Sequence, residues 1–206
     1  MPISKKDAVK QADLIVKKVL KDHDLLSEVL QSVRAKEDSI RYPNAIALEI
    51  LSEKYPEIIY PEWDFFLDLL KSKNAYHKSI AISTIANIAL IDEKKKFNLI
   101  FNEFFDLLDN KSVIVARKLA IYSGRIAKAK PSLRTKITEI LLQIDKTKHN
   151  PNRKDLIKGD IIESFSEYFK DITEKKEVLD FVKAQLNSSS PSTVKKSKEF
   201  LRKWEQ

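Results

Sequence analysis

Turn signals recur along this chain at a nearly constant interval, and this periodicity constrains the fold more than any other feature. They form two interleaved series, and successive members of each lie roughly 37 to 41 residues apart. The segments between them have helical spacing of apolar residues and no convincing β alternation. Helix pairs with a period near forty residues are typical of a stacked α-solenoid. The first series comprises 36–39, 72–74, 109–112, 148–152 and 187–191, and the second comprises 55–61, 92–95, 130–132 and 170–173.

Composition excludes several classes of protein. Only Gly124 and Gly159 are glycines, which argues against tight β-turns and phosphate-binding loops. With no cysteine, the chain has no disulfide, no Cys-ligated zinc and no thiol nucleophile. The N-terminal twenty residues are charged throughout, and no run of 18 apolar residues occurs, so neither a signal peptide nor a membrane span is predicted. We expect a cytoplasmic protein without a membrane partner.

Capping residues mark several helix starts. Ser4 and Asp7 form a capping box that opens a helix to about Lys21, with Ala8, Ala12, Ile15 (or Val16) and Val19 on one face. A second helix is predicted over 25–34. The pairs Asn150-Pro151 and Ser190-Pro191 each place a capping side chain before a first-turn proline. Recurrent phenylalanines are predicted to lie in the core between helices: Phe65, Phe66, Phe104, Phe105, Phe165 and Phe169.

One repeat carries a family resemblance. DNKSVIVARKLAIYSGRI, from Asp109 to Ile126, resembles the HEAT-repeat pattern of an acid at the turn, Val-Arg opening the second helix, and a Leu-Gly-x-Leu end. Arg117 is displaced by one residue from that pattern, and Ser123 stands where leucine is usual. Residues 187–196 are a second, partial match.

The resemblance covers roughly residues 25 to 206. It implies an all-α fold, a right-handed α-α superhelix of about five HEAT-like helix pairs with an extra N-terminal helix. We expect a single domain over residues 1–206. The helices over 1–21 and 191–206 are expected to cap its two ends.

The predicted helix over 112–129 has two distinct sides. One arc is predicted to be buried. The opposite arc is cationic and partly apolar, and the segment contains no acid. The buried arc comprises Val115, Ala116, Leu119, Ala120, Tyr122, Ile126 and Ala127, and the opposite arc comprises Arg117, Lys118, Arg125 and Lys128 with Ile114, Ile121 and Gly124 between them.

Charge differs between the first and second helices of the pairs. The second helices together carry +9, of which residues 112–130 contribute +5, and the first helices from residue 62 on carry −3. In HEAT arrays the second helices line the concave face, so the resemblance implies a basic groove. We expect a non-enzymatic scaffold that holds an acidic protein partner there, bound by Arg117, Lys118, Arg125 and Lys128 with Ile114 and Ile121 as apolar anchors.

Two alternatives accompany this interpretation. The same residues are also suited to binding nucleic acid through its phosphates. A lysine-rich surface that serves only solubility is the simpler account.

Residues suited to catalysis are scarce. His23, His77 and His149 are far apart in sequence, are predicted to be exposed at turns, and suggest no metal site. No G-x-S-x-G motif, cofactor loop or small-molecule substrate is indicated. One HEAT-like family, the alkylpurine DNA glycosylases, would need a carboxylate beside tryptophan in the groove. Trp63 with Asp64 or Asp68 is the candidate set, although Trp63 opens a first helix and is expected to face outward.

Overall fold

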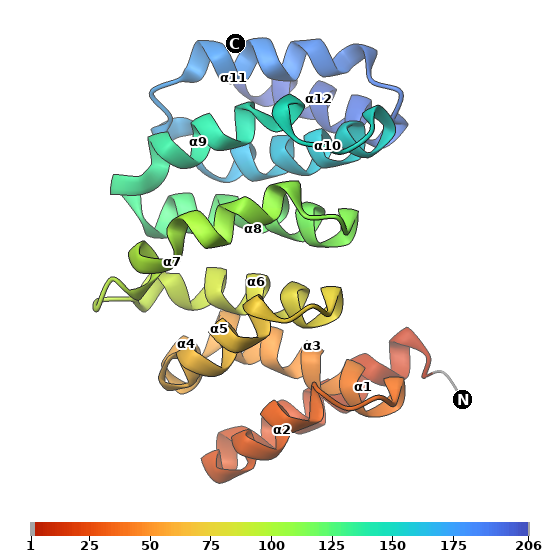
Figure 1. Ribbon diagram of the computed structural model, residues 1–206, viewed down its shortest axis with the longest axis vertical. Coiled ribbons are helices and arrows are strands. Elements are labelled where there is room, and N and C mark those ends of the chain that lie inside the picture. The colour runs from red at the N-terminus through yellow and green to blue at the C-terminus, as the bar shows by residue number, and fades with distance from the viewer. Residues whose placement is uncertain (1–2, 206) are drawn as a thin grey trace. The chain divides into compact units, whose positions relative to one another are not determined.

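The structure, a computed structural model, describes residues 3–205 and is all-helical over that range (Figure 1). Its residues group into two compact units, one ending at Asp92 and the other beginning at Glu93. Each unit is described separately below. The expectation of one continuous domain therefore stays a prediction.

The first unit contains six α-helices among its described residues. Helix α1 packs on α3, α3 packs on α6, and α5 packs on α6. The capping box opens α1 as predicted, since the backbone N–H of Asp7 donates to Ser4 Oγ at 3.1 Å. Val16 rather than Ile15 completes the buried face of α1. The helices are α1 (Lys5–Lys21), α2 (Leu26–Ser32), α3 (Asp38–Lys54), α4 (Pro56–Ile59), α5 (Trp63–Lys71) and α6 (Ala75–Ile88).

Two features of this unit differ from expectation. The predicted turn over 55–61 contains the short helix α4 followed by a 3-10 turn. Trp63 is buried rather than outward-facing, and its ring lies edge-on to Tyr60 with centroids 6.0 Å apart. Tyr60 belongs to the 3-10 turn directly before α5, so this turn contributes to the burial of the indole ring.

The second unit arranges its helices in two rows. Helices α8, α10 and α12 lie side by side in chain order, and α9 lies beside α11 (Figure 1). Both proline-marked starts are confirmed: Asn150 Oδ1 accepts from the Arg153 N–H at 3.0 Å, and Ser190 Oγ from the Thr193 N–H at 3.3 Å. The helices are α7 (Lys96–Phe105), α8 (Val113–Ala129), α9 (Arg134–Leu142), α10 (Pro151–Tyr168), α11 (Lys175–Ala184) and α12 (Pro191–Trp204).

Aromatic side chains fill the space between these helices. Five of the six phenylalanines predicted to be core are buried, whereas Phe65 is half-buried beneath the guanidinium of Arg34. Phe169 contacts two rings of α12, with centroids 5.0 Å away for Phe200 and 5.3 Å away for Trp204. These contacts attach α12 to the end of α10 by apolar burial.

Both glycines lie where neighbouring helices approach each other closely. A Cβ on Gly124 of α8 would lie 2.7 Å from the backbone oxygen of Ser164 on α10. A Cβ on Gly159 of α10 would lie 2.5 Å from Thr193 Oγ1 on α12. Gly124 is therefore buried against α10, which corrects its predicted place on the outward arc of this helix. Its lack of a side chain, rather than any backbone freedom, is what the packing uses.

Hydrogen bonds tie the turn before α10 to the segment about forty residues earlier in the chain. The Lys148 N–H donates to Asp109 Oδ1 at 2.6 Å, and His149 Nε2 lies 2.9 Å from the Leu108 carbonyl oxygen. His149 is consequently buried, contrary to the expectation of exposed turn histidines, while His23 is exposed and His77 half-buried.

The next turn is attached in the same way. Asp155 Oδ2 accepts from the Ser189 N–H at 2.9 Å and from its hydroxyl at 2.6 Å. Burial disfavours the ionised Asp155, but these hydrogen bonds outweigh burial and lower its pKa.

Over the described residues, no helix combines the length and apolar character that a membrane crossing requires.

Candidate binding surface on α8 and α10

The buried arc of α8 matches the prediction. All seven residues assigned to it are buried, so the rotational phase inferred from the sequence is correct. The repeated apolar spacing determines this phase, because it places those seven residues along one side of the helix.

Five residues on the opposite side form a line that we call the α8 stripe: Ile114, Lys118, Ile121, Arg125 and Lys128. They alternate in steps of four and three residues, which places them along one side of a helix. Ile114 is 66% exposed, and Lys128 is also exposed. Lys118, Ile121 and Arg125 are half-buried.

A buried tyrosine orders two cations of the stripe. Lys118 Nζ lies 4.6 Å and Arg125 Cζ 5.0 Å from the centroid of the Tyr122 ring. Attraction between cation and ring restricts both side chains to a few conformations. A ligand that binds them therefore has less side-chain entropy to remove.

Arg117 is directed away from the stripe toward α10. Its Nε donates to Asp160 Oδ2 at 2.6 Å, and its Nη2 to Asp160 Oδ1 at 3.3 Å. Asp160 is only 1% exposed, and Lys196 of α12 lies 3.1 Å from its Oδ1 on the other side. The hydrogen bond that Arg117 donates to Asp160 raises the pKa of Arg117 against the opposing effect of burial. This predicted site residue is therefore already held in an ion pair within the protein.

Two further acids of α10 lie near these cations. Glu163 Oε2 is 2.7 Å from Lys196 Nζ. Glu167 lies against α8, since its Cδ would be 3.0 Å from a Cβ placed on Gly124. Burial there raises the pKa of Glu167, although Arg125 and Lys128 oppose the rise. We call Asp160, Glu163 and Glu167 the acid row.

Sequence reasoning missed the acid row. Residues 152–170 sum to zero net charge and so looked uninformative. The spacing of the three acids, at 160, 163 and 167, does place them on one helix face and was the available signal. What the sequence lacked was evidence that this face of α10 turns toward the cations of α8.

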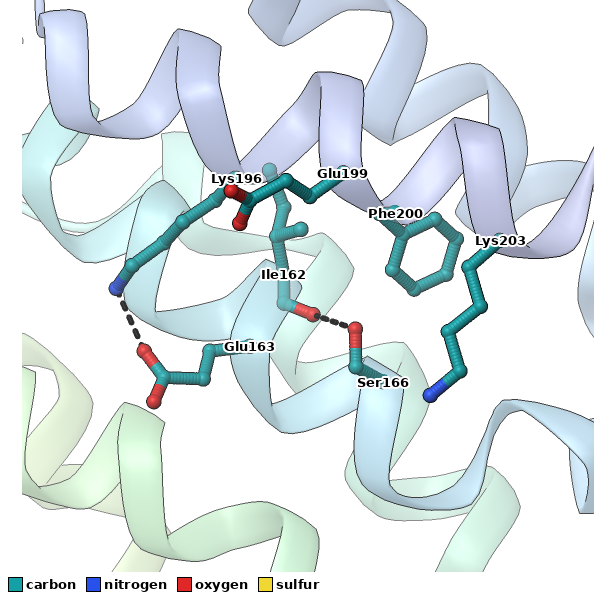
Figure 2. Close-up of a pocket in the computed structure, with 7 residues that line it drawn as sticks. All are labelled: Ile162, Glu163, Ser166, Lys196, Glu199, Phe200 and Lys203. Carbon is teal, nitrogen blue, oxygen red and sulfur yellow. Dashed lines mark hydrogen bonds and ion pairs between the residues drawn. The ribbon is translucent and has the colours of Figure 1, made fainter.

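A hollow of about 370 Å³ lies between α10 and α12 (Figure 2). Its rim carries both signs of charge, from Glu163, Lys196, Glu199 and Lys203. Figure 2 shows the Lys196 ammonium bonded to Glu163 at one end, while Lys203 lies at the other end beside Phe200. Phe200 is almost fully buried and offers little apolar surface, so the hollow is a mixed-charge surface feature rather than an apolar ligand pocket.

The residues considered for catalysis are not assembled into a site. Trp63 is buried, whereas Asp64 and Asp68 are exposed on the surface of the first unit. Within residues 3–205, no group of three or more potential metal-ligating side chains is placed to hold an ion.

No protein-family model and no curated protein sequence matches the chain. A solved structure from the Northeast Structural Genomics Consortium, titled as an engineered protein, is similar with a TM-score of 0.52 and 15% identity. The match covers 96% of this chain and 88% of that one. The similarity concerns the fold alone.

Proposed function

We propose that this chain is a HEAT-like scaffold that binds an acidic, amphipathic segment of a partner protein along the α8 stripe, without catalysis. In this proposal the helix pairs form a right-handed superhelix of about five repeats, capped by α1 and α12. The observation that carries the proposal is the stripe itself, in which the exposed Ile114 and the half-buried Ile121 alternate with cations, two of which lie against the Tyr122 ring.

The isoleucines favour a protein ligand. Ile114 is largely exposed on an otherwise charged face, an arrangement that solubility does not require. Apolar side chains at the centre of a binding patch contribute most of the affinity when a partner covers them. Phosphate groups are bound by cations and hydrogen-bond donors, so exposed isoleucines would not contribute to binding nucleic acid.

The predicted site residues take two roles in this proposal. Lys118, Arg125 and Lys128 face the carboxylates of the partner. Arg117 is a positioning residue, because its guanidinium is engaged by Asp160 and holds α8 against α10. Burial of Trp63 weighs against the glycosylase alternative, which requires an aromatic side chain exposed to a base.

The proposal is tested with a labelled synthetic helix whose Leu and Glu residues alternate to match the stripe. Truncating Ile114→Ala or Ile121→Ala should weaken its binding by about 1–3 kcal/mol each, roughly 5- to 150-fold. Leu99→Ala on α7 is the matched control, because Leu99 is 88% exposed but lies outside the stripe. Triple replacement of Lys118, Arg125 and Lys128 by Glu should abolish binding.

Two results would contradict the proposal. If a DNA duplex binds at moderate salt, and its affinity is the same for wild type and for both isoleucine variants, the nucleic-acid alternative is correct. If neither the synthetic helix nor the duplex binds even at low salt, the cations of α8 serve only solubility.

A further inference from the structure

Cations and acids lie on neighbouring helices across one face of the second unit. Helix α8 presents the cations of the stripe, α10 presents Glu163 and Glu167 of the acid row, and α12 presents Lys196 and Lys203 together with Glu199. The rows are adjacent because α10 lies directly between α8 and α12. Ion pairs cross both boundaries, from Arg117 to Asp160 and from Lys196 to Glu163.

Two acids of the middle row remain accessible to a ligand. The Glu163 side chain is 54% exposed although one of its oxygens bonds to Lys196. Glu167 is also exposed over part of its surface, although its carboxyl group is partly buried against Gly124, and it lies near Arg125 and Lys128 of the stripe. A ligand that reaches the stripe therefore meets carboxylates within the same contact area.

A uniform polyanion cannot contact the cations without also meeting these acids. Neighbouring helix axes lie roughly 8–10 Å apart. The major groove of a DNA duplex is already about 12 Å wide, and a duplex carries a charge for about every 1.7 Å of its axis. Phosphates would thus lie over Glu163 and Glu167, where like charges repel.

From this geometry we propose that Glu163 and Glu167 are specificity-determining residues: they reject nucleic acids and select a protein helix with one acidic edge and one basic edge. The proposal rests on the proposed use of this face for binding. The acidic edge of the partner faces Lys118, Arg125 and Lys128, and its basic edge faces Glu163 and Glu167. A helix about 10 Å across presents two such edges at the spacing of α8 and α10.

The first test uses a labelled DNA duplex as the probe. The double variant Glu163→Gln with Glu167→Gln should bind it at least about tenfold more tightly than wild type, with a steeper salt dependence. The matched control is Glu139→Gln with Glu177→Gln, exposed acids on α9 and α11 that change net charge equally. The proposal is overturned if the double variant gains nothing, or if the control gains as much.

The second test uses two synthetic helices with the same acidic edge, one bearing lysines and the other glutamines on its second edge. Wild type should prefer the lysine helix, and the Glu163→Gln, Glu167→Gln variant should lose that preference. Equal binding of both helices to wild type would overturn the proposal while leaving the α8 stripe intact as a binding site. If neither helix binds, but the double variant still binds the duplex more tightly than wild type does, the α8 stripe is not a protein-binding site. In that case Glu163 and Glu167 still act against the binding of nucleic acid.

Discussion

Asp160 is the residue that most clearly links three helices. It is almost completely buried, accepts two hydrogen bonds from Arg117 of α8, and contacts Lys196 of α12. A buried carboxylate is tolerated only where its charge is compensated, and Arg117 and Lys196 both supply positive charge here. The pairing explains why α8 carries an arginine and α12 a lysine at these positions.

Replacing Asp160 should therefore destabilise the protein more than replacing its exposed neighbour. Asp160→Ala leaves Arg117 and Lys196 without their shared acceptor and should cost about 1–3 kcal/mol. The cost stays below that of a fully buried pair because the Arg117 side chain is 42% exposed.

Glu163→Ala is the control, since a surface ion pair contributes about 0–1 kcal/mol. Urea denaturation with an unchanged m-value measures both variants. Equal losses for the two variants would mean that Asp160 is not the compensating group.

At the scale of helices, glycine determines how closely the second helices pack. Gly124 brings α8 onto the backbone of α10, and Gly159 brings α10 onto α12. Each glycine is intrinsically unfavourable inside a helix by roughly 0.5–1 kcal/mol relative to alanine. Its presence is explained by close packing, which also brings Glu167 against α8.

Gly124→Ala tests this explanation through the sign of its effect. The added Cβ would meet a backbone oxygen at 2.7 Å, which cannot rotate away, so α8 and α10 must separate. We expect a loss of about 1–3 kcal/mol. Gly159→Ala should cost a similar amount, because the added Cβ would meet the Thr193 hydroxyl at 2.5 Å and that hydroxyl is held by its hydrogen bond to the Asp155 carbonyl. Thermal melting monitored by circular dichroism would decide, and a stabilised Gly124→Ala variant would contradict the close packing.

At the scale of the whole molecule, the described chain divides into two compact units built from the same helix-pair element. In the second unit α8 is attached to α10, and α10 to α12, by the same three means: a glycine contact, an ion pair and a hydrogen-bonded turn. Stability in such an array is shared between neighbouring repeats, so an end helix stabilises more than its own residues.

Deleting residues 191–206 should therefore damage the second unit as a whole. The deletion eliminates the ring contacts of Phe169 with Phe200 and Trp204. It also eliminates the ion pair between Lys196 and Asp160. We expect a clearly lower melting temperature or aggregation, measured by scanning calorimetry and light scattering. Replacing the exposed Lys198 and Arg202 by Gln is the control for lost charge and should leave melting nearly unchanged. A truncated protein that is monomeric and melts as before would show that α12 is not needed.

The sequence by itself determined the helical class, the approximate helix boundaries, the capping residues and the buried face of α8. All of these depend on local spacing, because helix periodicity relates residues only three or four positions apart. The cations and isoleucines of the stripe could likewise be placed on one side of their helix.

Only the tertiary structure decided what lies opposite each residue. The residues in contact are separated in sequence by 43 positions for Arg117 and Asp160, by 36 for Lys196 and Asp160, and by 40 for Gly124 and Ser164. The offset varies because each helix rotates and slides against its neighbour until its side chains interdigitate. Since no constant period describes those rotations, the pairing of Arg117, the burial of Gly124 and the acid row beside the stripe follow from the packing of helices and not from the repeat.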